Sequence, residues 1–329
     1  MQALIDSASA PASRWVVLGT GGTIAGRAAQ AGDNVGYVAA QVSVADLVSA
    51  LPGLQTLPLE LEQVAQVDSK DMDFAVWQTL LARVAHHLKR PEVAGLVVTH
   101  GTDTLEETAF FLHSVLQPGK PVVLTCAMRP ATALVPDGPQ NLMDALAVAR
   151  HPGAQGVLVV CAGQIHGAED VAKVHTYRVD AFDSGDAGPL GCVEEGLVRL
   201  FRPWPQAHAT GLLDADTCQR VLTCVALPRV ALITSHADAD AWMVQALLTQ
   251  TDPVRPLRGM VVAATGNATV HRALQAALAQ AQAQGIEVVL CSRCARGRVL
   301  AAPGQNPAGL SSRSAVKTRI ALALDLLLH

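Results

Sequence analysis

Two glycine-rich segments carry threonine hydroxyls that could act as nucleophiles. The first is Gly19-Thr-Gly-Gly-Thr-Ile-Ala-Gly26, which holds Thr20 and Thr23 among residues with little side-chain bulk. It is not a nucleotide-binding loop, because the dinucleotide fingerprint needs glycine where this chain has Ile24 and the phosphate loop needs lysine where it has Arg27. A purely structural turn and a catalytic turn both remain open for this segment.

The second segment, Thr99-His-Gly-Thr-Asp-Thr104, places hydroxyls beside a carboxylate. Its structural interpretation is a capping box, with Thr102 or Thr104 as N-cap and Glu106 or Glu107 near the third helical position. Its functional interpretation is a second reactive hydroxyl. A threonine hydroxyl is a poor nucleophile until a neighbouring group takes its proton, so either segment needs a base. The sequence offers Lys173, Tyr37 and the histidines, and does not pair them.

A third polar segment, Val67-Asp-Ser-Lys-Asp-Met72, precedes an amphipathic stretch. Ser69 or Asp71 is expected to cap the helix that follows. The same helix start could also bind a substrate carboxylate through backbone N–H groups and a hydroxyl. The cap alone, and the cap combined with a ligand site, are both kept as interpretations.

The elements that must position these segments follow an α/β pattern. Short apolar runs predict buried parallel strands, and amphipathic stretches between them predict helices. The expected strands are 15–18, 95–99, 121–126 and 156–161, and the expected helices are 71–88, 105–116 and 140–149. Functional groups gather beyond the carboxyl ends of the strands in such sheets, and both threonine segments follow strands.

A second α/β unit is expected after a polar stretch that begins near Pro203-Trp-Pro205. We predict an N-terminal catalytic domain over 1–203, a linker over 204–227 and a smaller C-terminal domain over 228–329. The C-terminal strands are expected at 230–234, 260–265 and 286–290, and its helices at 239–248, 269–284 and 315–328.

Composition excludes several classes of protein. The 329 residues are 50% hydrophobic and 16% charged, which is too apolar for disorder, and no apolar run reaches the roughly 18 residues of a membrane helix. The net charge of −4 and the 3% aromatic content argue against a nucleic acid or an anionic membrane as partner. A water-soluble protein with a small-molecule partner is expected.

Cysteine usage and the N-terminus favour a cytoplasmic setting. Residues 1–13 have neither a basic start nor an apolar stretch, so no secretory signal is expected there. Cys126, Cys161, Cys224 and Cys291 lie in or beside apolar runs, as reduced buried thiols do. Cys294 completes a lone C-x-x-C with Cys291, and without a second ligand pair this is weak evidence for zinc or redox chemistry.

Several short segments of the chain occur in the same order and at the same spacing as the motifs of a known protein family. They are Gly21-Gly-Thr-Ile-Ala-Gly26, Asp68-Ser-Lys-Asp-Met72, Thr99-His-Gly-Thr-Asp-Thr104 with Glu107-Thr108, Ala127-Met-Arg-Pro130, Asp137-Gly-Pro139 with Asn141-Leu142, Asp170-Val-Ala-Lys173 and Gly188-Pro-Leu-Gly191, followed more sparsely by Gly266-Asn267 and Ser292-Arg293. In these segments the chain resembles the bacterial-type L-asparaginase and glutaminase-asparaginase family. The resemblance implies a two-domain fold with a larger, mainly parallel N-terminal sheet flanked by helices and a smaller C-terminal α/β domain.

The resemblance further implies hydrolysis of a side-chain amide, of L-asparagine or also of L-glutamine, through a threonine acyl-enzyme and without metal or cofactor. Thr23 falls at the nucleophile and Tyr37 at the tyrosine that assists proton transfer, while Thr102, Asp103 and Lys173 form the second cluster. The resemblance implies two alternative mechanisms for Thr102: it acts on the water in one, and it serves as a second nucleophile in the other. Because Asp103 favours a charged lysine, Lys173 is expected to orient groups and relay protons. Substrate contacts are implied for Gly22, Ser69, Lys70, Gly101, Thr102, Asp103, Ala127 and Asn267.

Oligomerisation is implied as well, as a homodimer or homotetramer in which a neighbour's C-terminal domain completes each site. Asn267 is our candidate for that contribution. The chain departs from the family at Lys70, where Gln or Glu usually helps to hold the substrate ammonium group, and we identify no counterpart of the acidic residue that a neighbour lends. Either Lys70 swings aside and asparagine is hydrolysed, or the substrate lacks the ammonium group, as succinamate and N-acyl asparagine do.

Two other classes of function remain as alternatives. A tRNA-dependent amidotransferase subunit built on the same amidase core would be expected to add an N-terminal domain and a basic surface, which this sequence does not suggest. A catalytically weak amino-acid-binding protein is the other, although retention of Thr23, Thr102, Asp103 and Lys173 together argues against it.

Overall fold

A large mixed sheet forms the N-terminal part of the computed structural model, which describes residues 13–329 except 31, 206–214, 251 and 304–306. The eight strands lie in the order β12-β11-β8-β7-β6-β5-β1-β4. The parallel strands are β1 (Arg14–Gly21), β4 (Leu59–Val67), β5 (Val93–Thr99), β6 (Pro121–Thr125) and β7 (Gly156–Cys161). The antiparallel strands are β8 (Gln164–Gly167), β11 (Gly191–Glu194) and β12 (Leu197–Leu200).

The order of the parallel strands marks where a site should form. From β1 the chain crosses to β4 on one side and then to β5 on the other, so the direction of winding reverses between β1 and β5. In open α/β sheets, ligands bind beyond the carboxyl ends of the strands at this kind of reversal. Gly21 ends β1 and Thr99 ends β5, so both threonine segments start at the reversal point.

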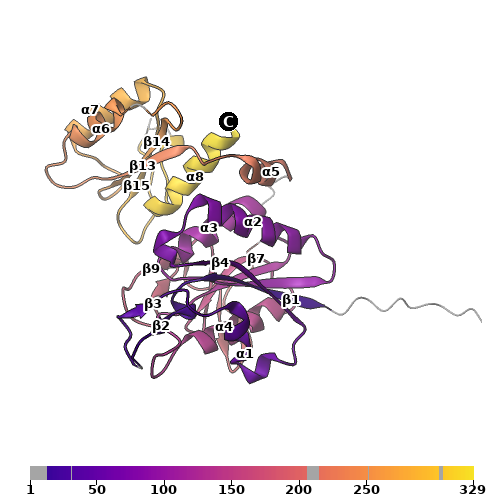
Figure 1. The fold of residues 1–329 in the computed structure, drawn as a ribbon. Helices are drawn as coiled ribbons and strands as arrows, with labels where there is room; N and C mark the ends of the chain where they lie inside the picture. Colours follow the sequence, from indigo (N-terminus) through magenta and orange to yellow (C-terminus); the bar gives the residue numbers. More distant parts are fainter. Residues whose placement is uncertain (1–12, 31, 206–214, 251, 304–306) are drawn as a thin grey trace, which may run out of the picture.

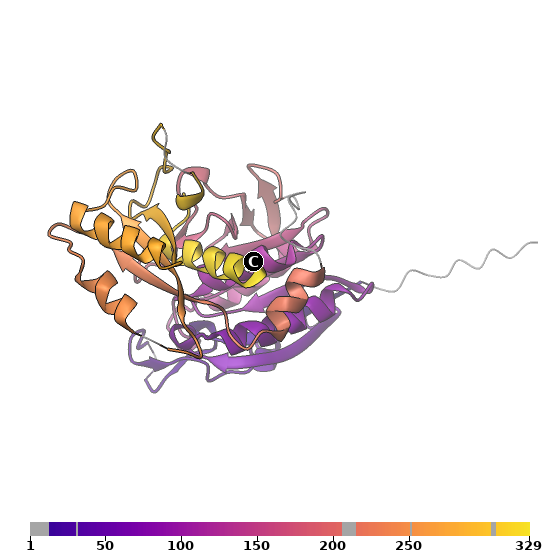
Figure 2. The ribbon, with the colours of Figure 1, turned by 90° about the horizontal axis from the view of Figure 1, so that it is seen from above.

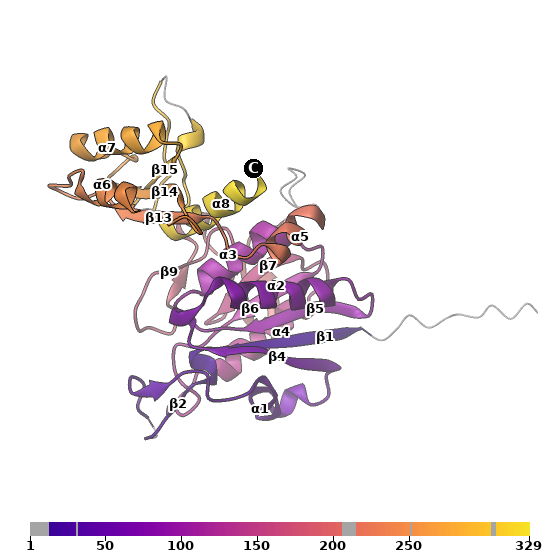
Figure 3. The same ribbon diagram turned by 45° about the horizontal axis from the view of Figure 1, so that its top comes forward.

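Helices cover both faces of this sheet (Figure 1, Figure 3). Successive residues of a strand point to opposite faces, so the continuous apolar runs supply two cores. Val16, Leu18 and Val98 pack under α2 (Phe74–Leu88) and α3 (Leu105–Leu116). Val17 and Val97 pack against α1 (Val44–Ser49) and α4 (Gly138–Arg150).

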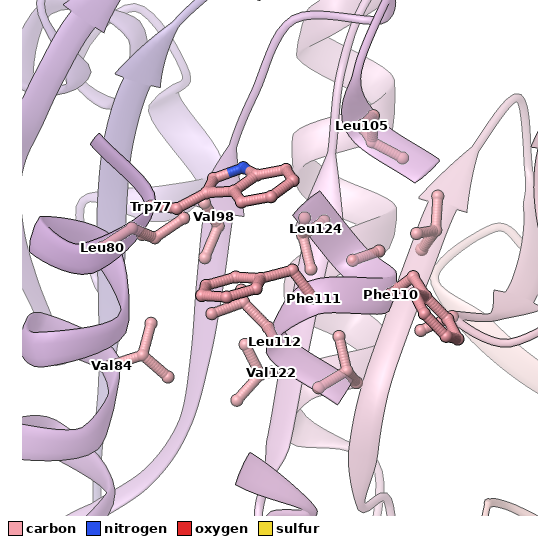
Figure 4. Close-up of a cluster of buried hydrophobic side chains, with 14 of the residues drawn as sticks. Trp77, Leu80, Val84, Val98, Leu105, Phe110, Phe111, Leu112, Val122 and Leu124 are labelled. Carbon is pink, nitrogen blue, oxygen red and sulfur yellow. The ribbon is translucent and has the colours of Figure 1, made fainter. Parts of the chain in front are cut away.

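The first core is built around stacked aromatic rings (Figure 4). The rings of Trp77 and Phe111 lie 4.7 Å apart and nearly parallel, which joins α2 to α3. The indole N–H of Trp77 donates to the Thr108 hydroxyl over 2.9 Å, so its polar atom is satisfied inside the core. The packing fixes the start of α3, which directly follows the second threonine segment.

The C-terminal part is a smaller three-layer unit. Its parallel sheet has the order β13 (Arg229–Thr234), β14 (Leu257–Ala264) and β15 (Glu287–Ser292). Helices α6 (Trp242–Thr249) and α7 (Arg272–Ala283) cover one face, and α8 (Ala315–Leu328) covers the other. Helix α8 also packs on the N-terminal core through Ile320, Ala323 and Leu324, so it lies between the two units (Figure 2).

Several elements differ from the sequence expectation. Helix α2 begins at Phe74, and its N-cap is Asp73, whose side chain accepts the Val76 N–H, so the prediction that Ser69 or Asp71 caps it is wrong. The expected linker contains α5 (Ala215–Thr223), which packs on the N-terminal core. Residues 206–214 of that linker and residues 1–12 of the N-terminus, where no secretory signal is expected, lie outside the described residues.

Four short strands form two small hairpin-like pairs near the site, β2 (Arg27–Ala28) with β3 (Tyr37–Val38) and β9 (Ala172–Lys173) with β10 (Phe182–Asp183). Among the described residues no helix is long and apolar enough to span a membrane. All seven cysteines are free thiols, with Cys126, Cys161 and Cys291 buried and Cys294 exposed. Cys224, which directly follows α5, is only partly buried, so the expectation that it is a buried thiol is wrong.

Candidate active site

The first threonine sits in a tight turn directly after β1. A 3-10 turn runs from Thr23 to Ala25, and Thr23 is buried at its start. The hydroxyl of Thr23 lies 2.7 Å from that of Tyr37. Tyr37 reaches it because β3 pairs with β2 and folds the chain back over the turn. A nucleophile candidate and a proton carrier are therefore in direct contact.

Backbone packing brings the two threonine turns together. A Cβ atom added to Gly22 would lie 2.2 Å from the Gly101 Cα, far inside contact distance, and Gly22 has a φ of +79°. A Cβ added to Gly101 would lie 2.4 Å from the Ser69 Oγ. Glycine is required at both positions, since only a bare backbone permits this approach. The turns that carry Thr23, Ser69 and Thr102 consequently share one small volume beyond β1 and β5.

A lysine organises the second threonine. The ammonium group of Lys173 donates to the Thr102 hydroxyl over 2.8 Å and to a carboxylate oxygen of Asp103 over 2.7 Å. Lys173 lies on β9, and its backbone N–H donates to the Glu106 carboxylate over 3.0 Å. Because the Lys173 ammonium group donates a hydrogen bond to it, the Thr102 oxygen is held in one orientation and still has a lone pair available. This arrangement can position a water or a substrate atom.

Ser69 links its own turn to the second threonine segment. Its buried hydroxyl oxygen accepts the Asp103 N–H over 3.1 Å, and its carbonyl accepts the Thr104 hydroxyl over 2.8 Å. Thr104 occupies the N-cap position of α3 but makes no side-chain cap bond, so the capping box does not form. The hydroxyl that would close the cap instead ties the two turns together.

His100 is a site residue that the sequence did not single out. It is fully buried, and burial lowers its pKa to about 4, so the ring is neutral at physiological pH. Its Nδ1 lies 2.7 Å from the Gly101 carbonyl, which only accepts, so Nδ1 carries the hydrogen. Nε2 then accepts the Thr108 hydroxyl over 2.9 Å. The ring thereby fixes the Gly101 carbonyl and turns the following N–H of Thr102 the opposite way.

Lys70 forms ion pairs with two neighbouring carboxylates. Its ammonium group is ion-paired with Asp68 and, at 3.2 Å, with Asp71. These two carboxylates raise the Lys70 pKa, with the Asp68 hydrogen bond as the larger cause. The side chain is exposed on a 3-10 turn that follows β4. Its charge is therefore compensated locally.

The remaining expected contact residues differ in placement. Ala127 is fully buried against Ile24 in the small core behind the Thr23 turn, so only its backbone can face the site. Asn267 lies in the C-terminal unit, and both polar atoms of its amide are bonded to the backbone of Leu300, at 2.8 and 2.7 Å. The structure thus groups Thr23, Ser69 and Thr102 with their neighbours and leaves Asn267 in a separate cluster.

Comparison with known proteins identifies the family of the chain. The family described as "Asparaginase, N-terminal" matches residues 14–206, and "Glutaminase/Asparaginase C-terminal domain" matches residues 229–324. The chain belongs to the asparaginase family. The family resemblance and the α/β fold class expected from the sequence are both confirmed.

Relatives within the asparaginase family include a protein named "Probable L-asparaginase periplasmic" from Haemophilus influenzae, 36% identical over 284 residues, which are 85% of this chain and 78% of the relative. A glutaminase-asparaginase from Pseudomonas fluorescens is 35% identical over 295 residues, 89% of this chain and 78% of the relative. A crystal structure of a "Probable Cytoplasmic L-asparaginase" from Campylobacter jejuni superposes with a TM-score of 0.85 at 34% identity and covers 95% of both chains.

Proposed function

We propose that this asparaginase-family amidohydrolase cleaves the side-chain amide of L-asparagine to the acid and ammonia, with L-glutamine as a second substrate. The observation that carries the proposal is the juxtaposition of Thr23, bonded to Tyr37, with the Lys173-organised Thr102 across the Gly22–Gly101 contact. Relatives named L-asparaginase and glutaminase-asparaginase support both substrates.

The proposed first step is attack of the Thr23 oxygen on the amide carbon. Tyr37, 2.7 Å away, is within reach to take the threonine proton and to pass a proton to the departing nitrogen. The C–N bond breaks, ammonia leaves, and an ester to Thr23 remains. Backbone N–H groups of the two glycine-containing turns, including Thr102 N–H, are suited to stabilise the oxyanion.

The second step releases the acid. A water adds to the ester carbon while Thr102, held by Lys173, takes or relays its proton, and the Thr23 hydroxyl is regenerated. Direct attack by Thr102 as a second nucleophile is the alternative course. Asp103 and Ser69 are proposed to bind the α-ammonium and α-carboxylate of the substrate, with Gly22, Gly101 and the Ala127 backbone lining the pocket.

Ammonia release from threonine variants tests the assignment. We expect Thr23→Ala and Thr102→Ala each to lower kcat by about 10³-fold or more, because each removes a reacting or water-positioning hydroxyl. Thr23→Ser, which keeps a hydroxyl, should retain part of the activity. Thr79→Ala, on the exposed face of α2, is the control and should behave as wild type. Near-normal turnover in either active-site alanine variant would overturn the assignment.

A substrate panel separates the alternatives for specificity. Asparagine, glutamine, succinamate and N-acetyl asparagine are compared by kcat/KM. The proposal predicts that the highest kcat/KM belongs to asparagine or glutamine, which carry a free ammonium group. If succinamate or N-acetyl asparagine is preferred by a wide margin, the enzyme is an amidase for substrates that lack that group. Binding of amino acids by calorimetry without ammonia release would instead indicate a weak amino-acid-binding protein.

The remaining proposals concern organisation and location. We propose the division into a catalytic domain over 1–203, a linker over 204–227 and a C-terminal domain over 228–329. We also propose assembly into a homodimer or homotetramer with shared sites. A cytoplasmic location is proposed from the thiol content. Named relatives occur in both compartments, one periplasmic and one cytoplasmic, so fractionation of the native host is the test.

A further inference from the structure

A lysine from the C-terminal unit is buried against the backbone that carries Lys173. Lys317 lies on α8, and its residue is only 2% exposed. Its ammonium group donates to the backbone carbonyl of Glu169 over 2.9 Å and to that of Val171. These two carbonyls lie in the segment between β8 and β9, immediately before Lys173. Figure 3 shows α8 above α3 and close to the β9 region.

The other side of the same segment is held by α3. The Glu106 carboxylate accepts the backbone N–H of Lys173 over 3.0 Å. Burial raises the Glu106 pKa, and the charge of Lys317 opposes that rise. Residues 169–173 are therefore fixed from two sides, by the Glu106 carboxyl group on α3 and by the Lys317 ammonium group on α8.

The charges around Lys317 explain why a lysine can be buried there. Burial lowers its pKa to about 8, while the carboxylates of Glu106, Glu169 and Asp170 raise it and the nearby Arg313 lowers it. The Phe110 ring of α3 lies 6.0 Å from the ammonium group. At neutral pH the group is mostly charged, and two of its hydrogens are used on carbonyls. Such a group costs more to bury than an apolar one, and here its charge holds two backbone carbonyls in place.

We infer that Lys317 is a positioning residue for amide hydrolysis, because it holds the backbone of residues 169–171 at the point where Lys173 reaches Thr102 and Asp103. The inference rests on the proposed function for its kinetic consequence. It gives the C-terminal unit a role in the site of its own chain. A displacement of about 1 Å in a catalytic group is enough to lower the rate by about 10²-fold, so loose anchoring of β9 would lower kcat.

A neighbouring cation of α8 provides the control. Arg319 pairs with Glu107 of α3 at 3.4 Å, on the same helix and across the same junction between the two units. This ion pair is made to α3 and does not involve residues 169–173. Removal of Arg319 weakens the docking of α8 and leaves the Lys173 segment untouched, whereas removal of Lys317 releases that segment.

The experiment compares Lys317→Met with Arg319→Met in the full-length chain. For Lys317→Met we expect kcat to fall by about 10- to 100-fold with KM changed by less than about threefold, because orientation of Lys173 is lost while substrate-binding groups stay. Arg319→Met should keep kcat within about twofold of wild type. Circular dichroism checks that each variant is folded. If Lys317→Met does not fold, Lys317→Leu, which also removes the ammonium donors, replaces it.

A second readout does not depend on turnover. Limited acetylation followed by mass spectrometry measures how readily the Lys173 amine reacts, and we expect more labelling of Lys173 in the Lys317 variant than in wild type or Arg319→Met. A folded Lys317 variant with wild-type kcat and wild-type Lys173 labelling overturns the inference, as does an equal loss in Arg319→Met. If wild type releases no ammonia, the proposed function fails, and the labelling comparison alone decides whether Lys317 positions Lys173.

Discussion

A cation beside a bound ammonium group opposes binding unless carboxylates compensate it, and Lys70 has two such partners. Because Asp68 and Asp71 pair with its ammonium group, we expect Lys70→Gln to change the KM for asparagine by less than about threefold. Initial rates of ammonia release over a range of asparagine concentrations measure this. A KM that falls tenfold or more in Lys70→Gln would mean that the charge does repel the substrate.

The paired carboxylates supply the matched control. In a variant with Asp68→Asn and Asp71→Asn, the Lys70 charge loses both partners, so the KM for asparagine should rise. Succinamate, which lacks the ammonium group, should not show the same rise. An equal change for both substrates would assign the effect to distortion of the Ser69 turn, of which Asp68 is the N-cap.

The individual reactive residues could be predicted from the sequence, but their pairing could not. Thr23, Thr102 and Lys173 stand in recognisable motifs, whereas the 2.8 Å contact of Lys173 with Thr102 depends on how β9 packs near α3. His100 stands in the second threonine segment, but the sequence does not distinguish it from the other histidines, and no motif includes Lys317. Their roles come from burial, and burial is set by tertiary packing that a single sequence does not display.

At the scale of elements, the strands that follow continuous apolar runs were the predictable ones. β1, β5, β6 and β7 are buried on both faces, so their sequences are uniformly apolar. β4 (Leu59–Val67) was not anticipated, because it lies at the sheet edge and its residues alternate between polar and apolar. The short antiparallel strands carry too few residues for any periodicity to be read.

The turn after β5 makes the stability of the fold depend on pH. His100 has a pKa of about 4 in the folded protein, below the ordinary value of 6.5, so the unfolded chain binds its proton first as pH falls. The stabilisation is present above pH 6.5 and is lost between 6.5 and 4. From pH 7 to 4.5 we expect this residue to remove about 2 to 3 kcal/mol of the free energy of unfolding.

Urea unfolding at pH 7 and pH 4.5 checks this contribution. His100→Gln should be less stable than wild type at pH 7 but should lose about 2 to 3 kcal/mol less on acidification. His166, which is also buried with a pKa lowered to about 4, contributes in the same direction in both proteins. The exposed Thr79 provides the control, since Thr79→Ala removes no titratable group and should keep the wild-type slope. Identical slopes for His100→Gln and wild type would contradict the assignment.

At the scale of the whole molecule, the proposed sharing of sites between subunits has a quantitative consequence. If Thr23 of one subunit and Asn267 of its neighbour serve one site, Thr23→Ala and Asn267→Ala should each be weakly active alone. In a mixed dimer, one site then carries both substitutions and the other carries none. A preparation that contains only mixed dimers should therefore regain about half of wild-type activity.

To measure this recovery, the two variants are co-expressed with different affinity tags, purified through both tags and assayed for ammonia release. Sedimentation gives the number of subunits. Both polar atoms of the Asn267 side chain are hydrogen-bonded to the backbone of Leu300, so this residue stabilises the loop that would contact the neighbouring subunit. We therefore expect Asn267→Ala to lose activity even if the amide does not contact the substrate. No recovery in the doubly purified dimer, or full activity in a monomer, would show that each chain builds its site alone. Recovery near a half would show that the C-terminal unit serves its neighbour's site through the Asn267 loop, in addition to the role that the Lys317 variants test in its own chain.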